Sequence, residues 1–199
     1  DSISDTGVIT VSGQASFRTD TTDKLITLNS QNAITGQVTF STIGTGGDVI
    51  LDNGTTAISL GTIASNAIGG DLSLLTDAAQ TISNAITLGG SGADLTITVD
   101  NANSLTVQAA LTTNAGDITL SADDDVIFTA AGDISSTNGN ISVTADDDAT
   151  ADAGSGGALT MADGTVFSAA SGTITGISDE DLTLGQMTTT NSTSTAITL

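Results

Sequence analysis

The chain has 199 residues and a formal net charge of −21, and it contains no His, Cys, Pro, Trp or Tyr. Nucleic acids and anionic membranes are poor partners for so acidic a chain, because both require a basic surface. No stretch approaches the roughly 20 apolar residues of a membrane helix. The absence of Cys excludes disulfides and thiolate metal sites, and four Phe are too few aromatic residues for a large globular core.

A three-residue pattern recurs in eight places: an apolar residue, usually a Ser or Thr, and a second apolar residue. Six of the seven intervals between these segments are 23 residues long. The segments begin at Ile26, Val49, Leu72, Leu95, Ile118, Ile141, Leu159 and Leu182. A fixed period of this length is typical of a solenoid.

The alternation within each segment predicts a half-buried β-strand with its apolar residues turned inward. Other apolar residues keep the same period and predict further inward columns: Phe17, Phe40, Ile63 and Ile86; Ile82, Leu105 and Phe128; Leu88, Leu111 and Ile134. Glycine marks the corner before most of the segments, at Gly47, Gly70, Gly116, Gly139 and Gly157. We therefore predict an all-β fold, a right-handed parallel β-helix of about 23 residues per coil. Residues 1–199 form one repeat segment, which we expect to be part of a longer chain or fibre.

One interval departs from the period, because only 18 residues separate Ile141 from Leu159. The intervening segment is rich in Ala, Gly and Asp. We interpret it as a shortened coil or a local bulge, and we favour a deletion in a bend.

Two sets of acidic residues share the period. Asp77, Asp100, Asp123 and Asp146 predict a stack of carboxylates along one edge, and a second row consists of Asp48, Asp71, Asp94, Asp117 and Asn140. The first row is the candidate metal site, with Ca²⁺ held between coils by carboxylates and bend carbonyls. The clusters 123–125 and 146–148, with Asp152, are the best places for it. The alternative is a solvated acidic face, because the ligand spacing matches no defined calcium loop.

Catalysis is not expected, because His, Cys and Tyr are absent and only carboxylates, hydroxyls and two cations remain. Arg18 and Lys24 are those two cations, and we interpret them as surface partners of Asp20 and Asp23. The Ser and Thr residues in the middle of the three-residue segments would form an outward column of hydroxyls, which raises an ice-binding hypothesis. A flat ice-binding face needs a second column beside the first, and only Thr98, Ser121 and Thr144 supply one. We favour the ordinary preference of Thr for a solvent-facing strand.

Three stretches carry a family likeness: residues 116–122 (GDITLSA), 131–134 (AGDI) and 138–145 (NGNISVTA). They resemble the repeats of filamentous-haemagglutinin-like adhesins and related giant β-helical surface proteins of bacteria. The resemblance implies a secreted, right-handed β-helical shaft at the bacterial cell surface, commonly adhesive or biofilm-associated, with no catalytic residues.

From the residues and the resemblance together, we expect a non-catalytic structural and adhesive shaft segment of an extracellular bacterial protein. Its expected partners are neighbouring subunits joined end to end and host or matrix glycans. Two alternatives stay open: a Ca²⁺-dependent matrix scaffold, and a carbohydrate-active β-helix enzyme that uses paired Asp residues.

Overall fold

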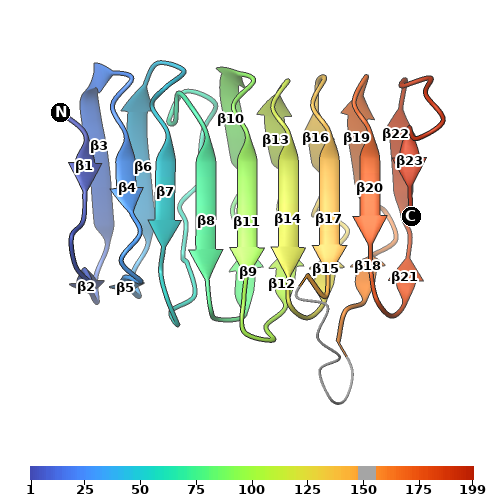
Figure 1. Cartoon of the computed structure of the whole chain (residues 1–199), viewed down its shortest axis with the longest axis horizontal. Coiled ribbons are helices and arrows are strands. Elements are labelled where there is room, and N and C mark those ends of the chain that lie inside the picture. Colours follow the sequence, from blue (N-terminus) through green and yellow to red (C-terminus); the bar gives the residue numbers. More distant parts are fainter. Residues whose placement is uncertain (148–155) are drawn as a thin grey trace.

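The computed structural model describes residues 1–147 and 156–199, and in these ranges all the named elements of secondary structure are strands. The strands form parallel sheets that wind into a solenoid (Figure 1). As the chain advances from the N-terminal end, the near strands in Figure 1 run downward and the far strands run upward. The coil is therefore right-handed, and the predicted parallel β-helix is confirmed.

One sheet, here called the front wall, contains nine strands and extends along the whole molecule (Figure 1). Its strands are β1 (Ile3–Ser4), β4 (Ile26–Leu28), β7 (Val49–Asp52), β8 (Leu72–Thr76), β11 (Leu95–Val99), β14 (Ile118–Ala122), β17 (Ile141–Ala145), β20 (Ile174–Ile177) and β23 (Ile197–Thr198). We number coils 1 to 8 by the front-wall strands that open them, from β1 to β20. Paired residues in neighbouring strands of this wall are 23 positions apart in the sequence, except between Ile141 and Ile174.

Two further walls complete the coil. The lower wall contains β9 (Gln80–Ile82), β12 (Leu105–Val107), β15 (Val126–Phe128), β18 (Leu159–Met161) and β21 (Leu182–Thr183). The rear wall contains β10 (Ile86–Ser91), β13 (Leu111–Asn114), β16 (Ile134–Ser136), β19 (Val166–Ala170) and β22 (Gln186–Thr189). Coils 1 and 2 have two separate pairs instead, β2 (Thr10–Val11) with β5 (Ala33–Ile34) and β3 (Ala15–Thr22) with β6 (Val38–Ile43).

The interpretation of the 18-residue interval is wrong. Leu159–Met161 pairs with Val126–Phe128 of the lower wall, and the strand that follows Ile141 in the front wall begins at Ile174. Coil 7 is thus ten residues longer than the others, rather than shortened. Leu182 also belongs to the lower wall, where it pairs with Leu159. These triplets look like front-wall strands because any half-buried strand of this protein has the same alternation.

Two of the predicted columns are also wrong in register. Val107, rather than Leu105, lies between Ile82 and Phe128. Ile86, rather than Leu88, is the partner of Leu111. The bend after β11 is two residues longer than its predecessor and includes Asn101 and Ala102, both with positive φ (63° and 52°). The front wall keeps its period because β10 has two extra residues opposite β13, where the register shifts between Leu88 and Ser91.

The core is a set of stacked apolar columns inside the three walls. In β11 and β17 the residues alternate between buried and half-buried, so that one face of each strand packs inside. Leu95, Ile118 and Ile141 occupy one front-wall column and are fully buried. In coils 6 and 7 the rings of Phe128 and Phe167 meet edge to face with centroids 4.8 Å apart, a favourable geometry for aromatic pairs.

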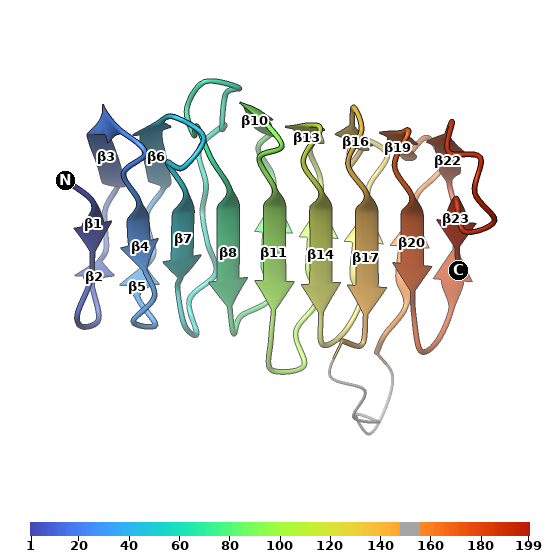
Figure 2. The same ribbon diagram turned by 45° about the horizontal axis from the view of Figure 1, so that its top comes forward.

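The upper corners, between the rear and front walls, come forward in Figure 2. Here successive backbones approach so closely that a Cβ on Gly139 would overlap the carbonyl oxygen of Gly116. A Cβ on Gly172 would likewise overlap the carbonyl oxygen of Gly139. The predicted corner glycines Gly116 and Gly139 therefore have a steric cause. Gly157, by contrast, precedes a lower-wall strand, and Gly172 is the corner residue of coil 7.

We expect Gly139→Ala to lower the free energy of unfolding by about 2 to 4 kcal/mol, because the added methyl group must displace backbone rather than a flexible side chain. The matched control is Gly7→Ala, where an added Cβ has no neighbour within 4 Å. Urea unfolding followed by far-ultraviolet circular dichroism measures both. Equal effects of the two substitutions would contradict the steric explanation.

Candidate functional site

The predicted acidic row lies in the bends that follow front-wall strands. Thr76, Val99, Ala122 and Ala145 are aligned in register, and each is followed by an Asp of the row. The N–H of Asp100 donates to the carbonyl of Thr76 (2.9 Å), and that of Asp123 donates to Val99 (3.0 Å). The structure thus brings Asp77, Asp100 and Asp123 together as consecutive members of a stack.

The fourth predicted member departs from this pattern. Asp146 has a positive φ of 59°, and its N–H donates to the carbonyl of Asp124 (3.3 Å). The N–H of the next residue, Asp147, makes the bond to Ala122 (3.1 Å) that continues the row. Asp147 therefore takes the stacked backbone position at this end. We call Asp77, Asp100, Asp123 and Asp147 the acid row.

The acid row changes the protonation of its central residue. Burial raises the pKa of Asp100 above its ordinary value of 3.8, and the charges on Asp123, Asp77, Asp147 and Asp52 raise it further. A carboxylate in this position is destabilised both by lost hydration and by like charge. A cation would relieve that repulsion. In the described residues, however, no group of three or more acidic side chains is arranged to hold a metal ion.

The acidic clusters next to the row have structural bonds of their own. The carboxylate of Asp124 accepts a hydrogen bond from the hydroxyl of Ser104 (2.6 Å), and Asp125 accepts one from the N–H of Ala158 (3.0 Å). Asp148 and Asp152, which were also considered for Ca²⁺, lie outside the described residues. The Ca²⁺ site remains a prediction.

The second acidic row has a role that the sequence did not reveal. Each side chain accepts a hydrogen bond from the backbone N–H of its counterpart one coil later. The bonds run from Asp71 to Asp48 (3.0 Å), Asp94 to Asp71 (2.8 Å), Asp117 to Asp94 (2.7 Å), Asn140 to Asp117 (2.7 Å) and Thr173 to Asn140 (2.9 Å). This Asx ladder binds the upper corners of coils 2 to 7 together, immediately before the next front-wall strand in each case.

The Asx ladder explains why Asn140 substitutes for Asp without a break, since an amide oxygen accepts the same bond. We expect Asp94→Asn to leave the free energy of unfolding unchanged or to raise it, because the acceptor stays while repulsion from Asp71 and Asp117 is removed. We expect Asp94→Ala to lower it by about 1 kcal/mol. Urea denaturation of both variants measures the difference, and equal stability would show that the carboxylate bond contributes nothing.

The acid row predicts a pH dependence of stability. Because the pKa of Asp100 is raised on folding, the folded chain holds this proton more tightly than the unfolded chain. The resulting stabilisation is complete below pH 3.8 and is lost as the pH rises through the raised pKa. We expect Asp100→Asn, which mimics the protonated form, to melt at a higher temperature than the native chain at pH 7. The difference should vanish near pH 3.

The control for this experiment is Asp163→Asn, which removes one exposed charge from the bend between the lower and rear walls, away from the acid row. A melting temperature of Asp100→Asn at or below that of the native chain at pH 7 would refute the electrostatic account. The same two variants test Ca²⁺ binding. If the row binds Ca²⁺, added CaCl₂ raises the melting temperature of the native chain and of Asp163→Asn, and Asp100→Asn loses this response.

Outward hydroxyls line all three walls. The front-wall column is Ser4, Thr27, Ile50, Ser73, Thr96, Thr119, Ser142, Thr175 and Thr198. The rear-wall column is Thr87, Thr112, Ser135, Ser168 and Thr188, and the lower-wall column is Thr81, Thr106, Ile127, Thr160 and Thr183. Because every wall has such a column, strand propensity explains the hydroxyls without a specialised ice face.

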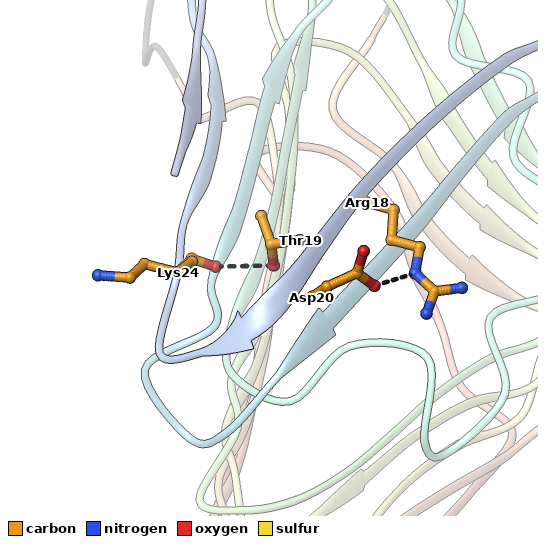
Figure 3. A network of polar contacts seen from close by, with 4 residues as sticks. All are labelled: Arg18, Thr19, Asp20 and Lys24. Atoms are coloured by element: carbon orange, nitrogen blue, oxygen red, sulfur yellow. Dashed lines mark hydrogen bonds and ion pairs between the residues drawn. The ribbon is translucent and has the colours of Figure 1, made fainter. Parts of the chain in front are cut away.

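The two cations lie in coil 1 (Figure 3). Arg18 forms an ion pair with Asp20, with 2.5 Å between Nε and Oδ1, and both side chains are largely exposed. The Lys24 side chain points away from this pair in Figure 3, and its backbone carbonyl accepts a hydrogen bond from Thr19 (3.3 Å). The carboxylate of Asp23 accepts a hydrogen bond from the N–H of Gly46 (3.0 Å). The predicted pairing with Asp20 is confirmed for Arg18.

No family model, curated protein or solved structure matches this chain. Within the described ranges, no helix has the length and apolar character needed to cross a bilayer.

Proposed function

We propose that this chain is a structural and adhesive shaft segment of an extracellular bacterial protein, without a catalytic role. The observation that carries the proposal is the unbroken front wall, nine parallel strands in register. At about 4.8 Å per strand it spans about 38 Å. The polar columns of the front and rear walls, of which the front one is interrupted at Ile50, give the surface a regular repeat together with the Asx ladder between them.

The repeated surface supports adhesion because it presents many identical groups to a partner. Weak contacts to hydroxyls and carboxylates add up when many identical groups stand at a fixed spacing, because each contact after the first is effectively intramolecular. Repetitive polymers such as host or matrix glycans offer a matching series of hydroxyls. The resemblance of residues 116–122, 131–134 and 138–145 to adhesin repeats points to the same class. Joining of subunits end to end would lengthen the repeating surface.

The second candidate is a Ca²⁺-dependent matrix scaffold, and the observation that favours it is the crowding of Asp100 by four neighbouring carboxylates. In that case the cation, rather than a glycan, is the ligand of the acid row. The CaCl₂ response of the Asp100→Asn variant separates this candidate from a metal-independent shaft. The enzyme alternative differs from both, because it requires that sugar products be released.

We expect the labelled chain to bind a subset of polysaccharides on a glycan array and to release no new reducing ends from them. Thr119→Lys, in the middle of the front wall, should weaken binding by about tenfold through lost complementarity. Thr183→Lys is the matched control, because Thr183 is an exposed Thr of the lower wall, outside those two columns. Absence of any glycan binding would refute the adhesive part of the proposal, and release of sugar products would favour the enzyme.

A further inference from the structure

Coil 3, residues 49–71, differs from the other coils. It contributes β7 to the front wall but has no strand in the lower or rear wall. The two strand pairs of coils 1 and 2 end before it, and the lower and rear sheets begin after it, at Gln80 and Ile86. Two of the three walls are thus interrupted at coil 3 while the front wall continues (Figure 1).

In the rear part of coil 3, some backbone hydrogen bonds go to coil 2 and others go to coil 4. Val38 of coil 2 exchanges bonds with Ser59 (2.7 Å) and Gly61 (3.1 Å). A few residues later the bonds go to coil 4 instead, since Ile63 donates to Ala85 (3.0 Å) and accepts from Thr87 (2.8 Å). The N–H of Gly89 in coil 4 also donates to Ser65 (3.1 Å), but isolated bridges take the place of named strands in this part of coil 3.

Side-chain amides replace the backbone ladder between coils 3 and 4 in the lower wall. Oε1 of Gln80 accepts the N–H of Ile58, and its Nε2 donates to the Ile58 carbonyl, both at 2.7 Å. Gln80 is only 2% exposed. Nδ2 of Asn84 donates to the carbonyl of Leu60 (2.9 Å). These two side chains link coil 4 to a stretch of coil 3 that forms no strand.

Packing is also incomplete at this place. A cavity of about 20 Å³ lies between the two coils and is lined by Ile58, Ser59, Leu60, Thr81, Ile82, Ser83 and Asn84. Side chains that border a void lose part of their van der Waals contacts. The coil 3–4 junction, which we define as residues 58–65 against residues 80–89, therefore combines a reduced ladder, side-chain substitutes and a void.

We propose that the coil 3–4 junction divides the solenoid into two units that unfold separately, coils 1–3 and coils 4–8. The hydrogen bonds of Gln80 hold the two units together. In a solenoid the stability is approximately a sum of coil terms and nearest-neighbour interface terms. The weakest interface then sets the boundary between cooperative units. This inference concerns the mechanics of the rod and does not rest on the proposed adhesive function.

The test is native-state hydrogen exchange of the full chain, read amide by amide at increasing urea. The backbone amides of coils 1–3 should share one opening transition, and those of coils 4–8 should open together at a higher urea concentration. Gln80→Ala should accelerate exchange in coils 1–3 by about 10- to 100-fold, because it leaves the buried N–H and carbonyl of Ile58 without their partner.

The matched control is Gln108→Ala, which removes an exposed Gln from the bend after β12, and it should leave exchange in coils 1–3 unchanged. A single common opening of all coils, or a boundary at another pair of coils, would overturn the proposal. So would equal effects of the two substitutions. If Gln80→Ala does not fold, the exchange pattern of the native chain still decides where the boundary lies.

Discussion

The parallel hydrogen-bond ladder of the front wall is the constraint on which the rest of this structure depends. It returns every 23 residues except between Ile141 and Ile174, and each return stacks an inward apolar residue on another, such as Leu95 on Leu72. A slip of one residue would turn every inward side chain outward, so the register in this wall is fixed. Length changes occur elsewhere: β12 is displaced by two residues, and ten additional residues lie between β17 and β18. Neither disturbs the front wall as a whole.

The same stacking that forms the core also brings like charges together. Adjacent unit charges at about 4.8 Å repel by roughly 1 kcal/mol in water, so an acidic solenoid must offset this repulsion or tolerate it. In the Asx ladder each carboxylate accepts a backbone N–H, but burial and the charges on Asp48 and Asp94 still raise the pKa of Asp71. In the acid row, burial and the charges of the neighbouring carboxylates raise the pKa of Asp100. The two rows thus have the same period, and each contains an Asp whose pKa is raised on folding.

The rod is regular outside and irregular at one place inside. Hydroxyl columns on all three walls present a repeated polar surface, which suits a shaft that binds through many weak contacts. Coil 3 interrupts the lower and rear walls, and Gln80 and Asn84 supply bonds that the backbone supplies elsewhere. Asn53 makes the same kind of contact between coils 2 and 3, where it bonds to both backbone groups of Ile34. The irregular region of the shaft therefore centres on coil 3, and its position follows from the ladder rather than from any change in composition.

The sequence by itself determined the solenoid, its period, most of the inward residues, two corner glycines and the stacking of Asp77, Asp100 and Asp123, because alternation and period record which side chains are buried and which repeat. It did not determine which wall a triplet joins. Leu159–Met161 has the same pattern as a front-wall strand, and only its bonds to Val126–Phe128 assign it to the lower wall. The backbone turn at Asp146, the bonds of the Asx ladder and the amide contacts of Gln80 were likewise decided by tertiary structure. Each depends on which backbone groups of the next coil come within hydrogen-bonding distance, and local patterns of polarity carry no record of that.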